Sequence, residues 1–242
     1  MYKTTQSISL IFALALVTCW ALPVSAAQPK APSDAVVADQ KAALKKHPGR
    51  KVYRSKTCLA CHGKDGAKAI LDYPNIAGQN KKYIIAQIED ILSGKRSAGL
   101  DQFGKPRTEG MRGALVTAEG DVRISKQEIE DVADYLSLLP PPAPKPPAEP
   151  ISEDRIKAGE KLYNSKGCKS CHGKDGLKPS NKAYPYIAGQ KSAYIALQIT
   201  DIKEKVRKNS KSKMMVTFTK KLSDEDILLI ADYLSQIDRS GK

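Results

Sequence analysis

The sequence contains the segment Cys58-Leu59-Ala60-Cys61-His62-Gly63-Lys64-Asp65-Gly66. A similar segment follows 110 positions later, Cys168-Lys169-Ser170-Cys171-His172-Gly173-Lys174-Asp175-Gly176. A second shared stretch follows each copy, because Pro74-Asn75-Ile76-Ala77-Gly78-Gln79 matches Pro185-Tyr186-Ile187-Ala188-Gly189-Gln190. The repeating unit is roughly a hundred residues long, which is too long for a solenoid repeat. The 242-residue chain is therefore predicted to contain two homologous small domains.

The Cys-x-x-Cys-His spacing of both copies is the pattern of covalent haem attachment. Cysteines at the first and fourth positions of a helical turn point the same way, so both thiols can add to the vinyl groups of one porphyrin. The next residue, a histidine, then presents a ring nitrogen to the iron. We therefore predict two haem c groups. Their thioether residues are Cys58, Cys61, Cys168 and Cys171, and their axial histidines are His62 and His172.

Other uses of the cysteines explain this pattern less well. Structural zinc would not require a histidine after each cysteine pair. A thioredoxin-like motif needs a preceding β-strand. No stretch of the sequence shows the alternation of apolar and polar residues that is typical of a strand. Two disulfides would leave both histidines unexplained. Each half also has few large apolar side chains, so a buried porphyrin would complete a core that is otherwise marginal for its size.

The second axial ligand of an electron-carrying haem is usually Met or His. After Met1 the chain has three methionines, and all lie between the predicted middle and last helices of a domain. Met111 is assigned to the first haem, and Met214 or Met215 to the second. Methionine is more often core filler, but confinement to this interval favours ligation. The remaining histidine, His47, is expected at the surface near the first helix start.

Helical patterns recur in both halves, and the predicted fold class is all-α. Ser125 and Glu128 have the spacing of a capping box, and apolar residues follow at helical intervals. Ser223 opens the matching helix in the second half, and Ser152 caps an earlier one. Each domain is expected to have one helix before its Cys motif, one after its Gly-Gln pair and one at its end.

The two halves are joined by a proline-rich segment. Seven of the eleven residues from Pro140 to Pro150 are proline, a composition that favours polyproline II and a semi-rigid spacer. The predicted organisation is a linker at 140–151 between a first domain at 45–139 and a second at 152–242.

The first 26 residues are typical of a cleaved signal peptide. Lys3 precedes a short apolar core, and Val24-Ser25-Ala26 offers small residues to a signal peptidase. The apolar core is too short to span a membrane, so the mature chain is expected to have no transmembrane segment. Residues 27–44 are predicted to form a flexible N-terminal arm.

The chain is strongly basic, with 40 Lys and Arg against 26 Asp and Glu, for a formal charge of +14. This charge favours acidic protein partners, and such encounters should weaken with salt. Nucleic acid is another acidic partner, but an export signal argues against it.

The doubled motif, the doubled Ile-Ala-Gly-Gln followed by Tyr83 or Tyr194, and the helix start Leu222-Ser223-Asp224-Glu225-Asp226-Ile227 carry a resemblance. They resemble class I cytochromes c, specifically the di-haem cytochrome c4 type, over about residues 45–139 and 152–238. The resemblance implies two homologous class I cytochrome c domains with neighbouring haems. It also implies His/Met ligation and electron transfer between redox partners in the periplasm.

The resemblance also assigns individual positions. Pro74 and Pro185 match the residue whose carbonyl accepts the N–H of the ligating histidine ring. The spacing from Met215 to Leu222 matches relatives, so Met215 is preferred to Met214.

Two glycines and one arginine match as well. Gly49 and Gly159 match the small residue at which the first and last helices cross, and Arg96 resembles a position near the haem propionates. The first domain departs from the pattern by about thirteen extra residues around its ligand loop. That loop is expected to shield the haem or to face a partner.

Several functions fit these expectations. The leading one is an electron carrier that is not itself an enzyme, with a membrane oxidase or a dehydrogenase as a possible partner. The chain also resembles the haem subunits of sulfide-oxidising flavocytochromes and other dehydrogenases, in which it would relay electrons within a complex. A catalytic di-haem enzyme would need an open axial site, which the available methionines argue against. A gas sensor lacks a signalling domain.

Overall fold

The computed structural model describes residues 34–147 and 149–240. The predicted signal peptide at 1–26 and the first part of the predicted arm lie outside the described residues. The described residues contain no β-strand, only isolated bridges between Leu100 and Pro106 and between Val116 and Val122. The all-α prediction is therefore confirmed for this part of the chain.

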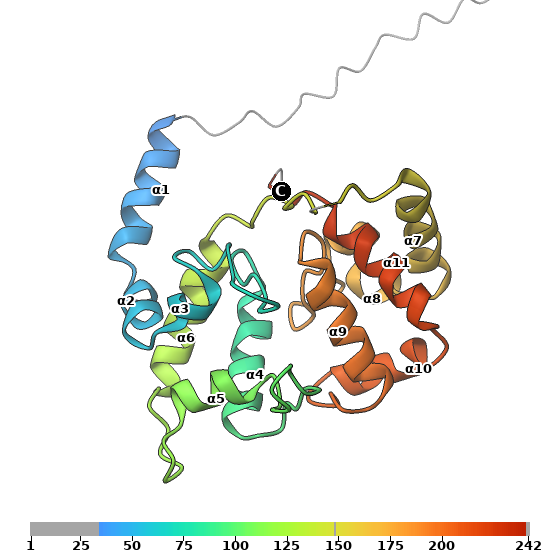
Figure 1. The fold of residues 1–242 in the computed structure, drawn as a ribbon. Coiled ribbons are helices and arrows are strands. Elements are labelled where there is room, and N and C mark those ends of the chain that lie inside the picture. The colour runs from blue at the N-terminus through green and yellow to red at the C-terminus, as the bar shows by residue number, and fades with distance from the viewer. Residues whose placement is uncertain (1–33, 148, 241–242) are drawn as a thin grey trace, which may run out of the picture.

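The chain forms two helical units that lie side by side (Figure 1). The helices of the first unit are α1 Asp34–Lys46, α2 Pro48–Ser55, α3 Cys58–His62, α4 Lys81–Leu92, α5 Glu109–Leu115 and α6 Lys126–Leu138. The α-helices of the second are α7 Glu153–Ser165, α8 Lys169–His172, α9 Ser192–Lys203, α10 Val216–Thr219 and α11 Asp224–Ser235. The second unit also contains two short 3₁₀ helices, η1 Lys174–Gly176 and η2 Ser212–Met215. The expected three main helices of each domain are thus present.

Each unit is organised by the crossing of its first and last main helices. A Cβ atom on Gly49 of α2 would lie 1.9 Å from the backbone oxygen of Asp131 in α6. A Cβ atom on Gly159 of α7 would lie 2.1 Å from the backbone oxygen of Leu229 in α11. The helices can approach this closely only because both positions lack a side chain.

The last helix of each unit begins at a capping box, as predicted. The Ser125 hydroxyl accepts a hydrogen bond from the backbone N–H of Glu128, and the Glu128 carboxylate accepts one from the backbone N–H of Ser125. Ser223 and Asp226 make the same reciprocal pair at the start of α11. These caps satisfy backbone donors that a helix start otherwise leaves free.

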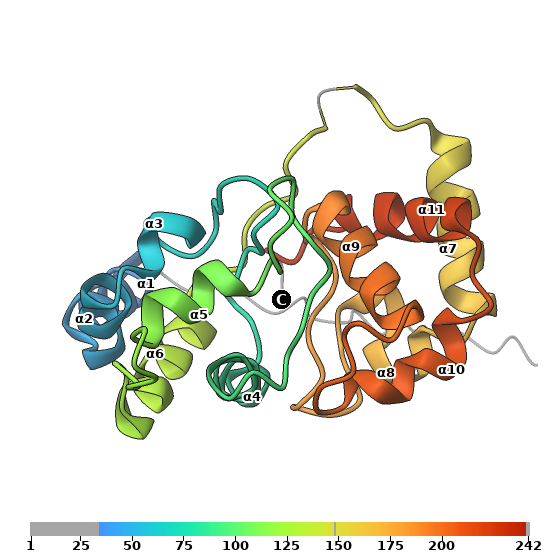
Figure 2. The same cartoon turned by 60° about the horizontal axis from the view of Figure 1, so that its bottom comes forward.

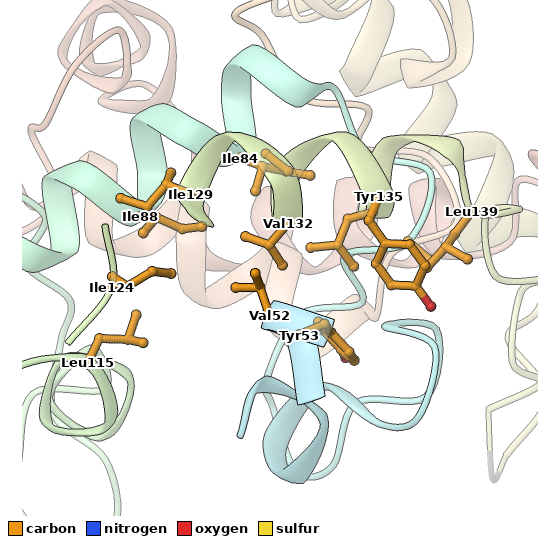
Figure 3. Close-up of a cluster of buried hydrophobic side chains, with 13 residues drawn as sticks. Val52, Tyr53, Ile84, Ile88, Leu115, Ile124, Ile129, Val132, Tyr135 and Leu139 are labelled. Atoms are coloured by element: carbon orange, nitrogen blue, oxygen red, sulfur yellow. The ribbon is translucent and has the colours of Figure 1, made fainter. Parts of the chain in front are cut away.

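The first core joins α2, α4 and α6 with the loop around α5 (Figure 3). Tyr53 is fully buried, and its hydroxyl donates a 2.6 Å hydrogen bond to the backbone oxygen of Gly63, just after α3. In the second core Tyr163 is equally buried and bonds the backbone oxygen of Gly173 at 2.7 Å. In both units this tyrosine therefore ties the Cys motif to the first helix.

The segment predicted as a flexible arm differs from that expectation where it is described. Residues from Asp34 onward form α1, which continues to Lys46. Ala42, Ala43 and the following Leu and Lys residues are strong helix formers. The helix ends before Pro48, because the residue ahead of a proline is disfavoured in the helical region. His47 there adopts an extended conformation and caps α2 through its ring Nδ1.

Candidate functional site

The Cys motif of each unit forms one short helical turn. Cys58 and Cys61 lie on α3, and Cys168 and Cys171 lie at α8, all half-buried and free of disulfides. Burial raises the pKa of the Cys58 thiol to about 11 and that of Cys168 to about 11. Two cysteines on one helical turn in each unit are suited to holding one ligand by two covalent bonds.

The histidine of each motif is buried and oriented by a backbone carbonyl. His62 is 8% exposed, and its Nδ1 lies 2.9 Å from the backbone oxygen of Pro74. His172 is 6% exposed, and its Nδ1 lies 3.3 Å from the backbone oxygen of Pro185. Burial lowers the pKa of both imidazoles, so both are neutral at pH 7. Each ring donates its Nδ1 proton to the carbonyl, which leaves the Nε2 lone pair for a metal.

The three methionines lie where the sequence placed them, between the middle and last helices. Met111 is on α5, half-buried and packed against the first core. Met214 and Met215 end the turn η2; Met214 is 52% exposed, whereas Met215 is half-buried. A thioether that reaches an interior site must be shielded, so this burial favours Met215 over Met214.

A polar network between the two units was not predicted as a whole. Arg96, after α4, donates hydrogen bonds to Gln87 at 3.0 Å and, across the interface, to the Tyr194 hydroxyl at 3.0 Å. Arg207, after α9, donates to Gln198 at 2.6 Å and, across the interface, to Gln87 at 3.0 Å. The sequence feature that indicates this network is the Tyr-x-x-x-Gln pattern. It occurs on both middle helices, and packing in an apolar core does not explain it.

These two arginines test whether the site suits haem. Both guanidinium groups bond the same Gln87 oxygen, and Arg96 Nε is buried without a hydrogen-bond partner. Neither group forms an ion pair with a carboxylate in the part of the chain that the structure describes. Buried cations without counter-charges are costly. Haem propionates are anions of the kind that would satisfy them, so the residues fit the group.

The His-bearing loops are also clamped across the interface. Gln79 accepts from the backbone N–H of Tyr186 at 2.8 Å and donates to its carbonyl at 2.9 Å. Gln190 makes the same pair of bonds with Asn75, at 3.0 and 2.7 Å. Each glutamine thus fixes, in the other unit, the residue that follows the His-orienting proline.

Comparisons with known proteins agree with this geometry. The cytochrome c family model matches residues 47–140 and 156–238. Cytochrome c4 of Azotobacter vinelandii is 31% identical over 75% of this chain and 84% of its own length. The thiosulfate dehydrogenase electron acceptor of Stutzerimonas stutzeri is 26% identical over 78% of this chain and 86% of its own. The crystal structure of reduced recombinant cytochrome c4 from Pseudomonas stutzeri superposes with a TM-score of 0.62 at 29% identity, covering 78% of this chain and 96% of that one.

Two helical units, each with a Cys-x-x-Cys-His turn and a carbonyl-oriented histidine, define a tandem class I c-type cytochrome. Within that class the chain belongs to the cytochrome c4 family. It is a di-haem electron-transfer protein with two covalently attached haem c groups.

Proposed function

We propose a residue assignment for the two haems. Each haem is held by the two cysteines of one motif and ligated by that motif's histidine. A methionine from the loop before the last helix would supply the other ligand to the iron. The first haem takes Cys58, Cys61, His62 and Met111, and the second takes Cys168, Cys171, His172 and Met215.

The observation that carries this assignment is the doubled histidine geometry. In both units a buried neutral imidazole is turned by a proline carbonyl so that only Nε2 remains free. The Pro74 and Pro185 carbonyls fix the ring orientation and increase its basicity toward a metal. When bound, haem supplies a reversible one-electron couple. A histidine and a methionine that both bound the iron would keep other molecules from it, which would suit a carrier rather than a catalyst.

Replacing the methionines tests the second ligand. Ferric haem with a Met ligand has a weak far-red absorption band, so Met215→Ala in the holoprotein should remove about half of it. Met214→Ala is the matched control and should leave the band intact. The assignment is wrong if Met214→Ala removes the band and Met215→Ala does not.

The catalytic alternative is tested by an added ligand. A carrier with both axial positions filled should bind carbon monoxide slowly or not at all in the reduced state at neutral pH. Rapid binding at one haem would indicate an open site and favour the catalytic di-haem enzyme.

We place the protein in the periplasm, exchanging electrons with acidic redox proteins such as a membrane oxidase or a dehydrogenase. The sequence of residues 1–26 and the similarity to cytochromes c4 support this. Among the described residues, no helix is long and apolar enough to cross a membrane. Mass spectrometry of the holoprotein from fractionated cells should find it in the periplasmic fraction and cleaved near Ala26. An intact N-terminus in the membrane fraction would contradict the proposal.

A second candidate is electron acceptance from one dehydrogenase within a fixed complex. The similarity to a thiosulfate dehydrogenase electron acceptor favours it. Native size-exclusion chromatography of the periplasmic fraction separates the two candidates. A free carrier elutes at the size of its own chain, whereas a subunit co-elutes with a larger oxidoreductase at low and high salt.

A further inference from the structure

The junction of α1 and α2 carries a basic surface that the second domain has only in part. α1 leaves α2 at the break between Lys46 and Pro48 and projects from the rest of the domain (Figure 1). A shallow, open hollow of about 590 Å³ lies beside the break. We call this hollow the elbow surface. It is lined by the basic side chains of Lys45, Lys46, Arg50, Lys51 and Arg54 together with Leu59.

Among the described residues, the Lys and Arg side chains of the elbow surface have no carboxylate partner, and the nearby Asp134 pairs with His47 and Lys81 instead. No acidic residue occurs between Gln40 and Lys64. None of the five basic side chains forms an ion pair with a carboxylate of residues 34–147 or 149–240. By contrast, the neighbouring Lys56 is paired with Glu128 at 3.1 Å. A cluster of uncompensated positive charge attracts an acidic surface and raises its rate of encounter.

The internal repeat shows which features are specific to the first domain. In the second domain Glu160 and Asn164 stand where α2 has Arg50 and Arg54. Arg155 and Lys161 keep the charge of Lys45 and Lys51, but Arg155 is paired with Glu225 and Asp232. The residue after the first motif cysteine is Leu59 in one domain and Lys169 in the other. Leu59 is 36% exposed, so the first domain has an apolar contact beside Cys58 with a basic rim around it. An apolar centre with a charged rim is the usual anatomy of a protein interface.

The bent helix that shapes the elbow is also specific to the first domain. The family match begins at residue 47, so α1 lies ahead of the first region that the cytochrome c model matches. In the second domain α7 runs unbroken from Glu153 to Ser165 through the equivalent positions. Its Ile156 occupies the place of Lys46, and no proline interrupts it.

We propose that the elbow surface docks an acidic electron-transfer protein and makes the first haem its site of electron exchange. This rests on the proposed function. One electron leaves the reduced partner and reduces one ferric haem, so no other reactant is needed. Contact at Leu59 would place the partner next to Cys58, which is proposed to hold the first haem.

The test uses the mature holoprotein and reduced flavodoxin, a small acidic electron donor, in stopped-flow experiments. The elbow variant Lys45→Gln/Lys46→Gln/Lys51→Gln/Arg54→Gln removes four charges. The matched control, Lys161→Gln/Lys169→Gln/Lys174→Gln/Lys178→Gln, removes four exposed charges from the second domain. At low salt we expect the second-order rate constant to fall at least tenfold for the elbow variant and less than threefold for the control. The difference should vanish at high salt.

Equal losses in the two variants would show that only net charge matters and would overturn the proposal. Anionic membrane binding is the other outcome to exclude. If the elbow variant loses binding to phosphatidylglycerol vesicles but reacts normally with flavodoxin, the surface serves a lipid and the proposal is wrong. The haem assignment is checked separately. Reduction by ascorbate and the far-red band should be unchanged in both variants, and their loss would instead implicate the proposed ligands.

Discussion

Gly49 and Gly159 show how a missing side chain positions two helices. At each, an added Cβ atom would overlap a backbone oxygen of the last helix, which cannot move aside as a flexible side chain could. The helix pair would have to separate, and the Cys motif is tied to the first helix of that pair by a buried tyrosine.

Gly49→Ala should therefore destabilise the holoprotein by about 3 kcal/mol or more, seen as a lower denaturant midpoint of the first domain. Gly113→Ala is the matched control. That glycine is in α5 with no atom within 4 Å of the added Cβ. There alanine should be neutral or stabilising by about 0.5–1 kcal/mol. Similar losses in both variants would mean that helix crowding is not the cause.

At the scale of single residues, many of the observed contacts could be predicted from the sequence. The serine caps follow from hydrogen bonding within four residues, and the histidine and proline contacts follow from the motif and the resemblance. The choice between Met214 and Met215 had rested on spacing to Leu222, and the exposure of Met214 now adds a physical reason. The sequence could not indicate that Arg96 Nε is buried without a hydrogen-bond partner, because this depends on groups far away in the chain.

Single elements differ from expectation where the two repeats diverge. The arm predicted at 27–44 becomes a helix from Asp34, because composition alone does not separate a mobile segment from one rich in helix formers.

The extra residues of the first ligand loop are predictable as an insertion, but the contact that they make is not. Arg107 in this loop donates to both carboxylate oxygens of Asp201 on α9, at 2.6 and 2.7 Å. Figure 2 shows the green loop lying against α9.

The Arg107–Asp201 pair anchors the loop that leads to Met111. The Asp201 side chain is only 5% exposed, and the backbone N–H of Gly99 also donates to it at 3.0 Å. Arg107→Leu leaves a buried carboxylate without its partner, so we expect a loss of about 3 kcal/mol in unfolding free energy. The far-red band of the first haem should weaken at lower temperature than in the parent protein. Arg112→Leu, an exposed neighbour on α5, is the control. If it has the same effect, the ion pair is not the anchor.

A double variant separates the charge from the packing. Arg107→Leu/Asp201→Leu removes both partners and should recover part of the lost stability, since no buried charge is then left alone. A further loss in the double variant would mean that the loop depends on Asp201 through Gly99 rather than through Arg107.

At the scale of the whole molecule, pseudo-symmetric polar contacts join the two domains. Three pairs of repeat equivalents make hydrogen bonds across the interface: Gln79 and Gln190, Tyr83 and Tyr194, and Arg96 and Arg207. The sequence revealed that these residues recur. It could not reveal that they face one another, because a repeat unit defines a domain and not the surface through which two copies associate.

This crossed arrangement predicts a crossed effect on the haems. Gln79, in the first domain, holds the backbone of Tyr186 beside Pro185, so Gln79→Ala should loosen the carbonyl that orients His172 and shift the potential of the second haem. Gln190→Ala should act in the same way on the first haem through Asn75. A net hydrogen bond is worth about 1 kcal/mol, which corresponds to a shift of at most about 40 mV for a one-electron couple.

The two potentials can be followed separately by redox titration monitored by NMR, in which each ferric haem has its own shifted methyl signals. Ser210→Ala provides the control. Its side chain also crosses the interface, to the Asp90 carboxylate on α4, but it bonds neither His-bearing loop. A shift confined to the haem of the substituted domain would contradict the crossed clamp. A shift of the opposite haem, with little change in Ser210→Ala, would show that each domain holds the ligand loop of the other in place.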